Sequence, residues 1–166
     1  MPNTYIAYNG APSLTSAMAP VTTGTAIKTL LQIATPATTE LRISEWGISF
    51  DGIAAATPIR CELIDTNVAA TVTAHTTSTV VTLNDNGTVA SKMTMGTTAT
   101  GYTAAVEGTV TAARLLDYQL IAPTGQFVHQ WPLGLEPEVA VSRFLRVRVT
   151  AAAAVNAVCY VVWTEA

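Results

Sequence analysis

Alternating apolar and polar residues recur along most of the chain and predict β-strands. Residues 26–34 place Leu31 and Ile33 on one face of such a strand, with Lys28 and Gln32 on the other. The same alternation, or a dense mixture of valine and threonine, marks further predicted strands. They span residues 40–50, 58–65, 68–73, 78–83, 113–121, 126–131, 144–150 and 155–164.

Local signals add detail to this pattern. The apolar face changes sides within residues 40–50, which predicts a β-bulge near residues 45–47. Asn86-Gly87 predicts a type I′ hairpin, because both residues tolerate positive φ. Residues 91–111 are rich in Thr, Ala and Gly, and we expect a long excursion with room for a short strand. Residues 151–154 are four alanines, which we interpret as a connection rather than a helical turn.

The chain contains no amphipathic helix pattern of useful length. About eight strands at this spacing are typical of an all-β, antiparallel sandwich of the jelly-roll or Greek-key type.

Residues 1–24 differ from the rest and lead us to expect an extended N-terminal arm, followed by one β-sandwich domain over residues 25–166. The segment contains Pro2, Pro12 and Pro20, which disfavour a stable helix or an interior strand. Its main apolar residues are Tyr5, Ile6 and Tyr8. Two interpretations stay open: an arm ordered on a neighbouring subunit, or a frayed terminus.

Charged residues make up only 11% of the chain, whereas hydrophobic residues make up 49%. Soluble domains usually carry roughly 25% charged residues. A surface with so few charges is explained if other subunits cover much of it. Enzymes need titratable groups, so the composition favours a structural or binding protein.

Charge and hydropathy also exclude classes of partner. The net charge of −3 argues against a nucleic-acid binder, and we interpret Arg146 and Arg148 as the outward face of a strand. The most apolar window, residues 150–163, is shorter than the ~20 residues that span a membrane. The chain begins without the signature of a secretory leader, so we expect synthesis in the host cytoplasm, with Cys61 and Cys159 as buried thiols.

Chemical motifs give little support to catalysis. His75 and His129 lack the spacing of metal ligands, and the sequence contains no Gly-x-Ser-x-Gly elbow. Glu45 and Asp117 are compatible with an acid/base pair across the sandwich, but nothing in the sequence requires one. We expect no catalytic, metal-binding or cofactor-binding residues, and therefore no enzyme.

The segment 131–137 joins two predicted strands, yet it carries Leu133 and Leu135. Apolar residues in a loop suggest either a contact surface or a cap on the end of the sandwich. Trp131 begins this loop; as for Trp46, its ring is compatible with sugar stacking, although core packing is commoner. The candidate interface residues are Tyr5, Ile6, Tyr8, Trp131, Leu133 and Leu135.

Several segments carry a resemblance to a known group of proteins. They are Glu45-Trp46-Gly47-Ile48-Ser49-Phe50-Asp51-Gly52, residues 55–64, Gln130-Trp131-Pro132-Leu133-Gly134 and Phe144-Leu145-Arg146-Val147-Arg148-Val149. Over residues 27–163 the chain resembles the capsid decoration (cement) proteins of tailed bacteriophages.

This resemblance implies a β-rich homotrimer on the outer surface of the capsid, bound to the major capsid protein and bracing the shell against internal pressure. The alternative is a carbohydrate-binding or host-attachment module of a phage fibre or virion surface, which requires an exposed aromatic platform. A hydrolase on a jelly-roll scaffold is a third possibility, and it requires a metal or a carboxylate pair.

Overall fold

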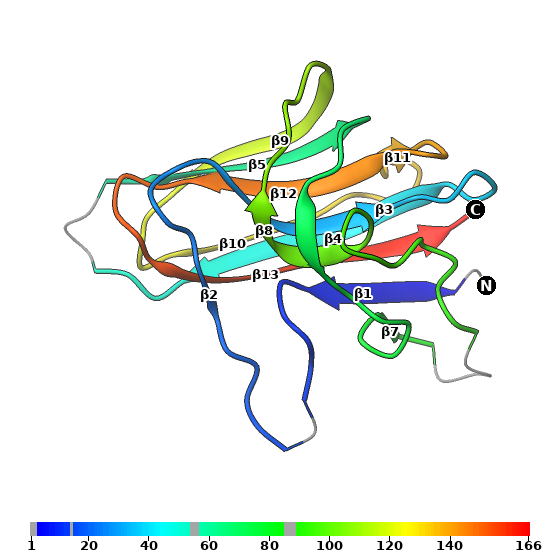
Figure 1. Ribbon diagram of the computed structural model, residues 1–166, viewed down its shortest axis with the longest axis horizontal. Helices are drawn as coiled ribbons and strands as arrows, with labels where there is room; N and C mark the ends of the chain where they lie inside the picture. Colours follow the sequence, from blue (N-terminus) through cyan, green and yellow to red (C-terminus); the bar gives the residue numbers. More distant parts are fainter. Residues whose placement is uncertain (1–2, 14, 54–56, 85–88) are drawn as a thin grey trace.

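The computed structural model describes residues 3–13, 15–53, 57–84 and 89–166. These residues form thirteen strands and no helix, arranged as two antiparallel sheets packed in a sandwich (Figure 1). The strands are β1 (Thr4–Tyr8), β2 (Val21–Thr22), β3 (Lys28–Ala34), β4 (Leu41–Phe50), β5 (Ile59–Thr66), β6 (Thr71–Ala74), β7 (Val81–Thr82), β8 (Gly101–Val106), β9 (Ala113–Ile121), β10 (Gln126–Gln130), β11 (Glu138–Val139), β12 (Phe144–Thr150) and β13 (Asn156–Glu165).

The seven-stranded sheet has the order β10-β4-β13-β1-β7, with β11 added to β4 and β2 added to β13. The six-stranded sheet has the order β6-β8-β3-β12-β5-β9. The predicted all-β antiparallel sandwich is therefore confirmed, but the expected strand number was too low. The two-residue strands β2, β7 and β11 are too short to show any periodicity.

The core lies between the inner faces of the two sheets. Trp46 and Trp163 are both fully buried in it, and the Tyr5 ring stacks on Trp163 with centroids 6.0 Å apart. Cys61 and Cys159 are buried and free, as the sequence predicts. Burial raises the pKa of the Cys61 thiol to about 12, so this cysteine behaves as a small apolar side chain.

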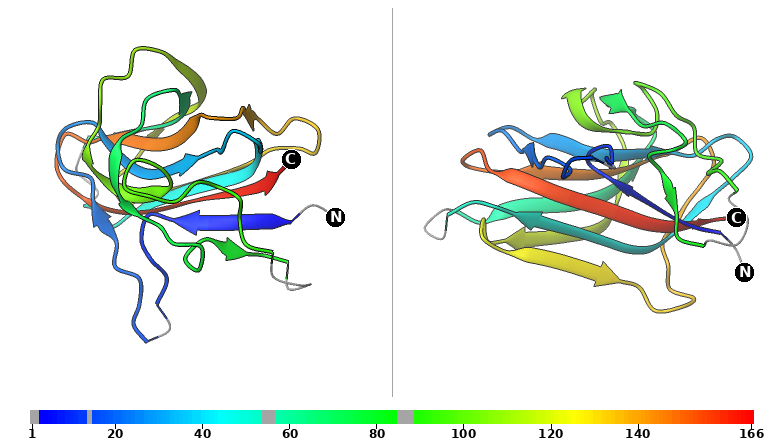
Figure 2. Two further views of the ribbon diagram at one scale, coloured as in Figure 1. Left: turned by 45° about the vertical axis from the view of Figure 1, so that its right-hand side comes forward. Right: turned by 90° about the horizontal axis from the view of Figure 1, so that it is seen from below.

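The N-terminal segment corrects one expectation. β1 pairs with β13 over all of Thr4–Tyr8 and with β7 on its other side, so it is an interior strand. Pro12 and Pro20 lie in the connection between β1 and β2, outside both strands, and therefore break no hydrogen bond of the sheet. Residues 1–24 are thus not one extended arm; the connection alone drops away from the sheets (Figure 2).

The bulge in β4 lies close to its predicted position. Glu45 pairs with Val162 and Ile43 pairs with Trp163, which leaves Ser44 as the extra residue. The predicted Asn86-Gly87 hairpin lies outside the described residues. Residues 151–154 form a connection, as expected.

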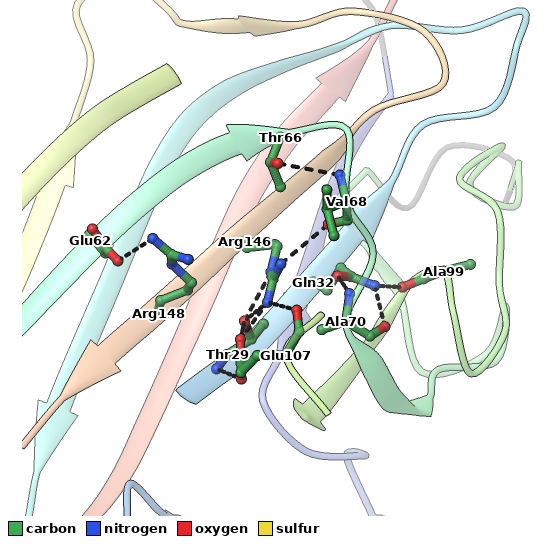
Figure 3. Close-up of polar contacts among 10 residues, drawn as sticks. All are labelled: Thr29, Gln32, Glu62, Thr66, Val68, Ala70, Ala99, Glu107, Arg146 and Arg148. Carbon is green, nitrogen blue, oxygen red and sulfur yellow. Dashed lines mark hydrogen bonds and ion pairs between the residues drawn. The ribbon is translucent and has the colours of Figure 1, made fainter. Parts of the chain in front are cut away.

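The described residues between 67 and 112 form an excursion in which β6 and β8 add to the six-stranded sheet and β7 pairs with β1 of the seven-stranded sheet. β8 is the short strand that residues 91–111 were expected to accommodate, and it adds to the six-stranded sheet beside β3. The excursion also covers part of the outer face of that sheet (Figure 3). Arg146 points to this outer face, as its alternation predicts, yet its side chain is 0% exposed.

Arg146 holds the excursion to the sheet (Figure 3). Its guanidinium forms an ion pair with Glu107 and donates hydrogen bonds to Thr29 Oγ1 at 2.7 Å and to the Val68 carbonyl at 3.2 Å. Beside it, Gln32 Nε2 donates to the Ala99 carbonyl at 2.7 Å. These hydrogen bonds satisfy the polar groups of Arg146 and Gln32, which the excursion shields from water.

We predict that Glu107→Ala lowers the free energy of unfolding by about 3 kcal/mol, because Arg146 keeps its buried charge without a counter-charge. Denaturant unfolding measures the change. Glu138→Ala is the matched control: it removes the exposed Arg42–Glu138 ion pair and is expected to cost less than about 1 kcal/mol. Equal losses in the two variants would contradict this role of Arg146.

Candidate protein-docking face

The outer face of the seven-stranded sheet, formed by the outward side chains of β1, β4, β10 and β13, carries a patch of apolar residues among polar ones. Along β13, buried Cys159, Val161 and Trp163 alternate with outward Val158, Tyr160 and Val162. Cross-strand pairing extends these outward positions into rows. One row runs through Val128, Gly47, Tyr160 and Tyr8, and the next through Gln130, Glu45, Val162, Ile6 and Val81.

Tyr160 lies at the centre of this outer face. A Cβ atom at Gly47 would come within 2.6 Å of the Tyr160 ring, so the absence of a side chain at Gly47 lets the ring lie flat on β4. The Tyr8 ring packs beside it, with centroids 5.9 Å apart. Between these tyrosines, Val128 and Val158, the face is hollowed by about 230 Å³.

The two charged residues among the outward side chains of β1, β4, β10 and β13 each have a bonding partner within the chain. Arg42 forms an ion pair with Glu138 at 2.5 Å. Glu45 accepts a hydrogen bond from the Tyr160 hydroxyl, and burial together with this carboxylate raises the pKa of Tyr160. Arg42 is thus neutralised within the chain, whereas Glu45 keeps its negative charge and is hydrogen-bonded to a neutral hydroxyl.

The candidate interface residues separate into three places. Ile6 and Tyr8 lie on the outer face, whereas Tyr5 is 1% exposed and belongs to the core, so it offers no contact to a partner. This corrects the sequence assignment, and its cause is the incorporation of β1 into the sheet. Leu133 and Leu135 lie in the loop that follows β10.

That loop presents its leucines to solvent. Leu133 is 97% exposed and Leu135 is 69% exposed, so neither caps the end of the sandwich. A hydrogen bond from the Leu135 N–H to the Pro132 carbonyl (2.9 Å) closes a turn that fixes both side chains. Trp131, at the start of the loop, stacks on His129 with ring centroids 4.2 Å apart.

A polar cluster that the sequence did not reveal links the two sheets at the edge formed by β9 and β10. Asp117 on β9 accepts hydrogen bonds from His129 Nδ1 at 2.6 Å, Trp46 Nε1 at 2.9 Å and Gln119 Nε2 at 2.8 Å. The contact between Asp117 and His129 could have been inferred from the sequence, because both residues lie on strands joined by a short turn at 122–125. Glu45 faces the opposite way, so the structure separates it from Asp117.

Asp117 fixes the orientation of the His129 imidazole. None of the contacts described above places a nucleophilic side chain beside that ring. Within residues 3–13, 15–53, 57–84 and 89–166, no group of three or more His, Cys, Asp or Glu side chains is placed to hold a metal ion. In the same part of the chain, no helix is long and apolar enough to cross a membrane.

The arginine cluster formed by Arg143 and by Arg146 and Arg148 of β12 does not form a cationic patch, because each guanidinium has a carboxylate partner. Arg143 pairs with Asp65 at 2.8 Å, Arg148 pairs with Glu62 at 2.6 Å, and Arg146 pairs with Glu107. The side chains that phosphate contacts would require are thus already neutralised.

Comparisons with known protein families, with curated proteins and with solved structures found no match.

Asp117 gives a prediction about acid stability. Burial by itself raises the pKa of its carboxyl, but hydrogen bonds from His129, Gln119 and Trp46 outweigh burial and hold the pKa below its ordinary 3.8. We expect Asp117→Asn to lower the free energy of unfolding by about 1–2 kcal/mol at neutral pH.

The sign of the pH dependence follows from the lowered pKa. The charged carboxylate stabilises the fold above the ordinary pKa of 3.8, and this contribution is lost as the pH falls through the lower pKa of the folded state. Urea unfolding of both proteins between neutral and strongly acidic pH measures the difference. A difference between wild type and Asp117→Asn that does not shrink in acid would contradict the assignment.

Proposed function

We propose that this chain is a structural virion protein that decorates and stabilises the capsid of a tailed bacteriophage. It binds the major capsid protein through the outer face of the seven-stranded sheet. The observation that carries the proposal is the character of that face: a patch of apolar side chains on interior strands, with Arg42 paired to Glu138 and Glu45 hydrogen-bonded to Tyr160.

An antiparallel sheet with one solvated face normally alternates apolar-in and polar-out residues. Here the outward positions of β13 include Val158, Tyr160 and Val162, and β1 adds Ile6 and Tyr8. Covering such residues contributes roughly 25 cal/mol per Å² of apolar surface removed from water. Repetition of the contact over many sites on one shell multiplies the effect of a modest interface.

The partner and the assembly state rest on the resemblance of residues 45–52 and 144–149 to decoration proteins. It supports a homotrimer on the outer surface of the capsid, built from a sandwich of the jelly-roll or Greek-key type. The low charge content of the chain supports extensive subunit contact in the same way.

The tryptophans give no support to the alternative of a carbohydrate-binding or host-attachment module, whereas Tyr118 is 45% exposed on β9. Such a module needs an exposed aromatic ring on which a sugar can stack. Trp46 and Trp163 are fully buried, and Trp131 is only partly exposed and stacks on His129. The described part of the chain therefore presents no free indole platform.

We predict that Val158→Lys weakens attachment to shells of the major capsid protein about tenfold or more, since it places an unpaired charge in the buried contact. Co-sedimentation with shells that lack the decorating chain measures attachment. Leu120→Lys is the matched control: Leu120 is 63% exposed on the six-stranded sheet, and this variant should attach like wild type. Unchanged attachment of folded Val158→Lys would refute the proposed face.

A further inference from the structure

β10 forms one margin of the seven-stranded sheet (Figure 2). The Phe50 N–H donates to the Gly125 carbonyl at 3.1 Å, and the Trp131 N–H donates to the Ser44 carbonyl at 3.0 Å. In an antiparallel ladder the bonded positions recur at every second residue. The main-chain groups of Phe127 and His129 therefore face β4.

The main-chain N–H and C=O groups of Gln126, Val128 and Gln130 consequently point away from the sheet. None of the strands described here pairs with that side of β10. All three residues are exposed, and Val128 is 56% exposed, so the row of donors and acceptors is open to another strand.

β10 also lacks the features by which proteins protect such an edge, namely Lys, Pro, a bulge or a very short strand. Its register with β4 is continuous from Gln126 to Gln130, and none of its residues is Lys, Arg, Asp or Glu. By contrast, β9 carries a register shift and Arg114, β6 carries a register shift, and β7 has two residues.

The sequence of β10 is suited to pairing with itself. A two-fold axis through Val128 places Val128 opposite its own copy and Gln126 opposite Gln130. Phe127 then lies opposite His129, an aromatic pair on the inner side of the sheet. Because the strand carries no acidic or basic side chain apart from His129, which is hydrogen-bonded to Asp117, no like charges meet across the axis.

We propose that β10 pairs antiparallel with β10 of a second copy of this chain, which joins two seven-stranded sheets into one continuous sheet. The open positions provide about six main-chain hydrogen bonds, two for each of three facing pairs. This isologous contact is separate from the shell contact of the outer face. If the chain is a homotrimer, the contact joins copies that belong to neighbouring trimers.

The exposed leucines fit this arrangement. The loop with Leu133 and Leu135 follows the C-terminal end of β10. Antiparallel pairing brings the C-terminal end of one strand beside the N-terminal end of the other. The leucines of each copy therefore lie next to the turn 122–125 of the second copy and bury apolar surface there.

The test uses proline at an outward main-chain position. Val128→Pro removes one N–H from the open edge and leaves the hydrogen bonds to β4 intact, while the side chain stays apolar. We expect the wild-type mass in sedimentation equilibrium to be at least twice that of Val128→Pro at the same concentration, since each copy contributes one edge. An equal mass for the folded variant would overturn the proposal.

A second measurement does not depend on how well the proline variant folds. Both native cysteines are buried, so a Val128→Cys variant has one accessible thiol on the proposed axis. Facing Cα atoms in a bonded antiparallel pair lie ~5.5 Å apart, within disulfide range. Mild oxidation should give a cross-linked dimer. The control is Val158→Cys, on the interior strand β13 of the same sheet, and this variant should form no cross-linked dimer. Equal cross-linking of Val128→Cys and Val158→Cys would refute the edge contact.

The same variants separate this proposal from the proposed function. Val158→Lys is expected to lose shell attachment and keep the wild-type mass, because Val158 lies on interior strand β13. Val128→Pro is expected to lower the mass whatever its effect on shell attachment, because the main chain of Val128 forms the open edge while its side chain lies on the outer face. If Val158→Lys lost self-association, the proposed edge contact would be wrong. If Val158→Lys still attached to shells, only the proposed docking face would be wrong.

Discussion

The buried ion pair between Arg146 and Glu107 determines how the two sides of this sandwich differ. Arg146 on β12 is fully buried because the segments that carry Val68 and Glu107 fold back over the six-stranded sheet and supply a carbonyl and a carboxylate to its guanidinium. The chain thus covers the outer face of one sheet with its own excursion. On the outer face of the other sheet, Ile6, Tyr8, Val158, Tyr160 and Val162 form an apolar patch.

This asymmetry explains why a chain with so few charges is suited to assembly. Most of the ionic side chains discussed here neutralise one another, as in Arg143–Asp65, Arg148–Glu62 and Arg42–Glu138. The remaining outward surface of the seven-stranded sheet consists largely of Val, Ile, Tyr, Ser and Thr. Such a surface costs little to desolvate, and it suits a protein that is covered on one side by a shell and joined at one edge to its own copies.

The sequence predicts the long strands well, because Leu41–Phe50 and Asn156–Glu165 have periodic patterns that hold over ten residues each. The sequence analysis missed β1, because Pro2 and Pro12 flank Thr4–Tyr8 and do not interrupt the five residues of this strand. It also fails for Asp117 and His129, whose contact depends on how β9 and β10 turn at residues 122–125. Of the interface candidates, Ile6 and Tyr8 reach the docking face, whereas Tyr5 is turned into the core by strand alternation.

The central claim is that the seven-stranded sheet faces a capsid shell. A cryo-EM reconstruction of the particle that contains this chain tests it most directly. We expect density in which Ile6, Tyr8 and Val158 contact the major capsid protein while the outer face of the six-stranded sheet, with Arg146 and Glu107, points away from the shell. A particle without this chain, or one in which it contacts the shell through the six-stranded sheet, would contradict the claim.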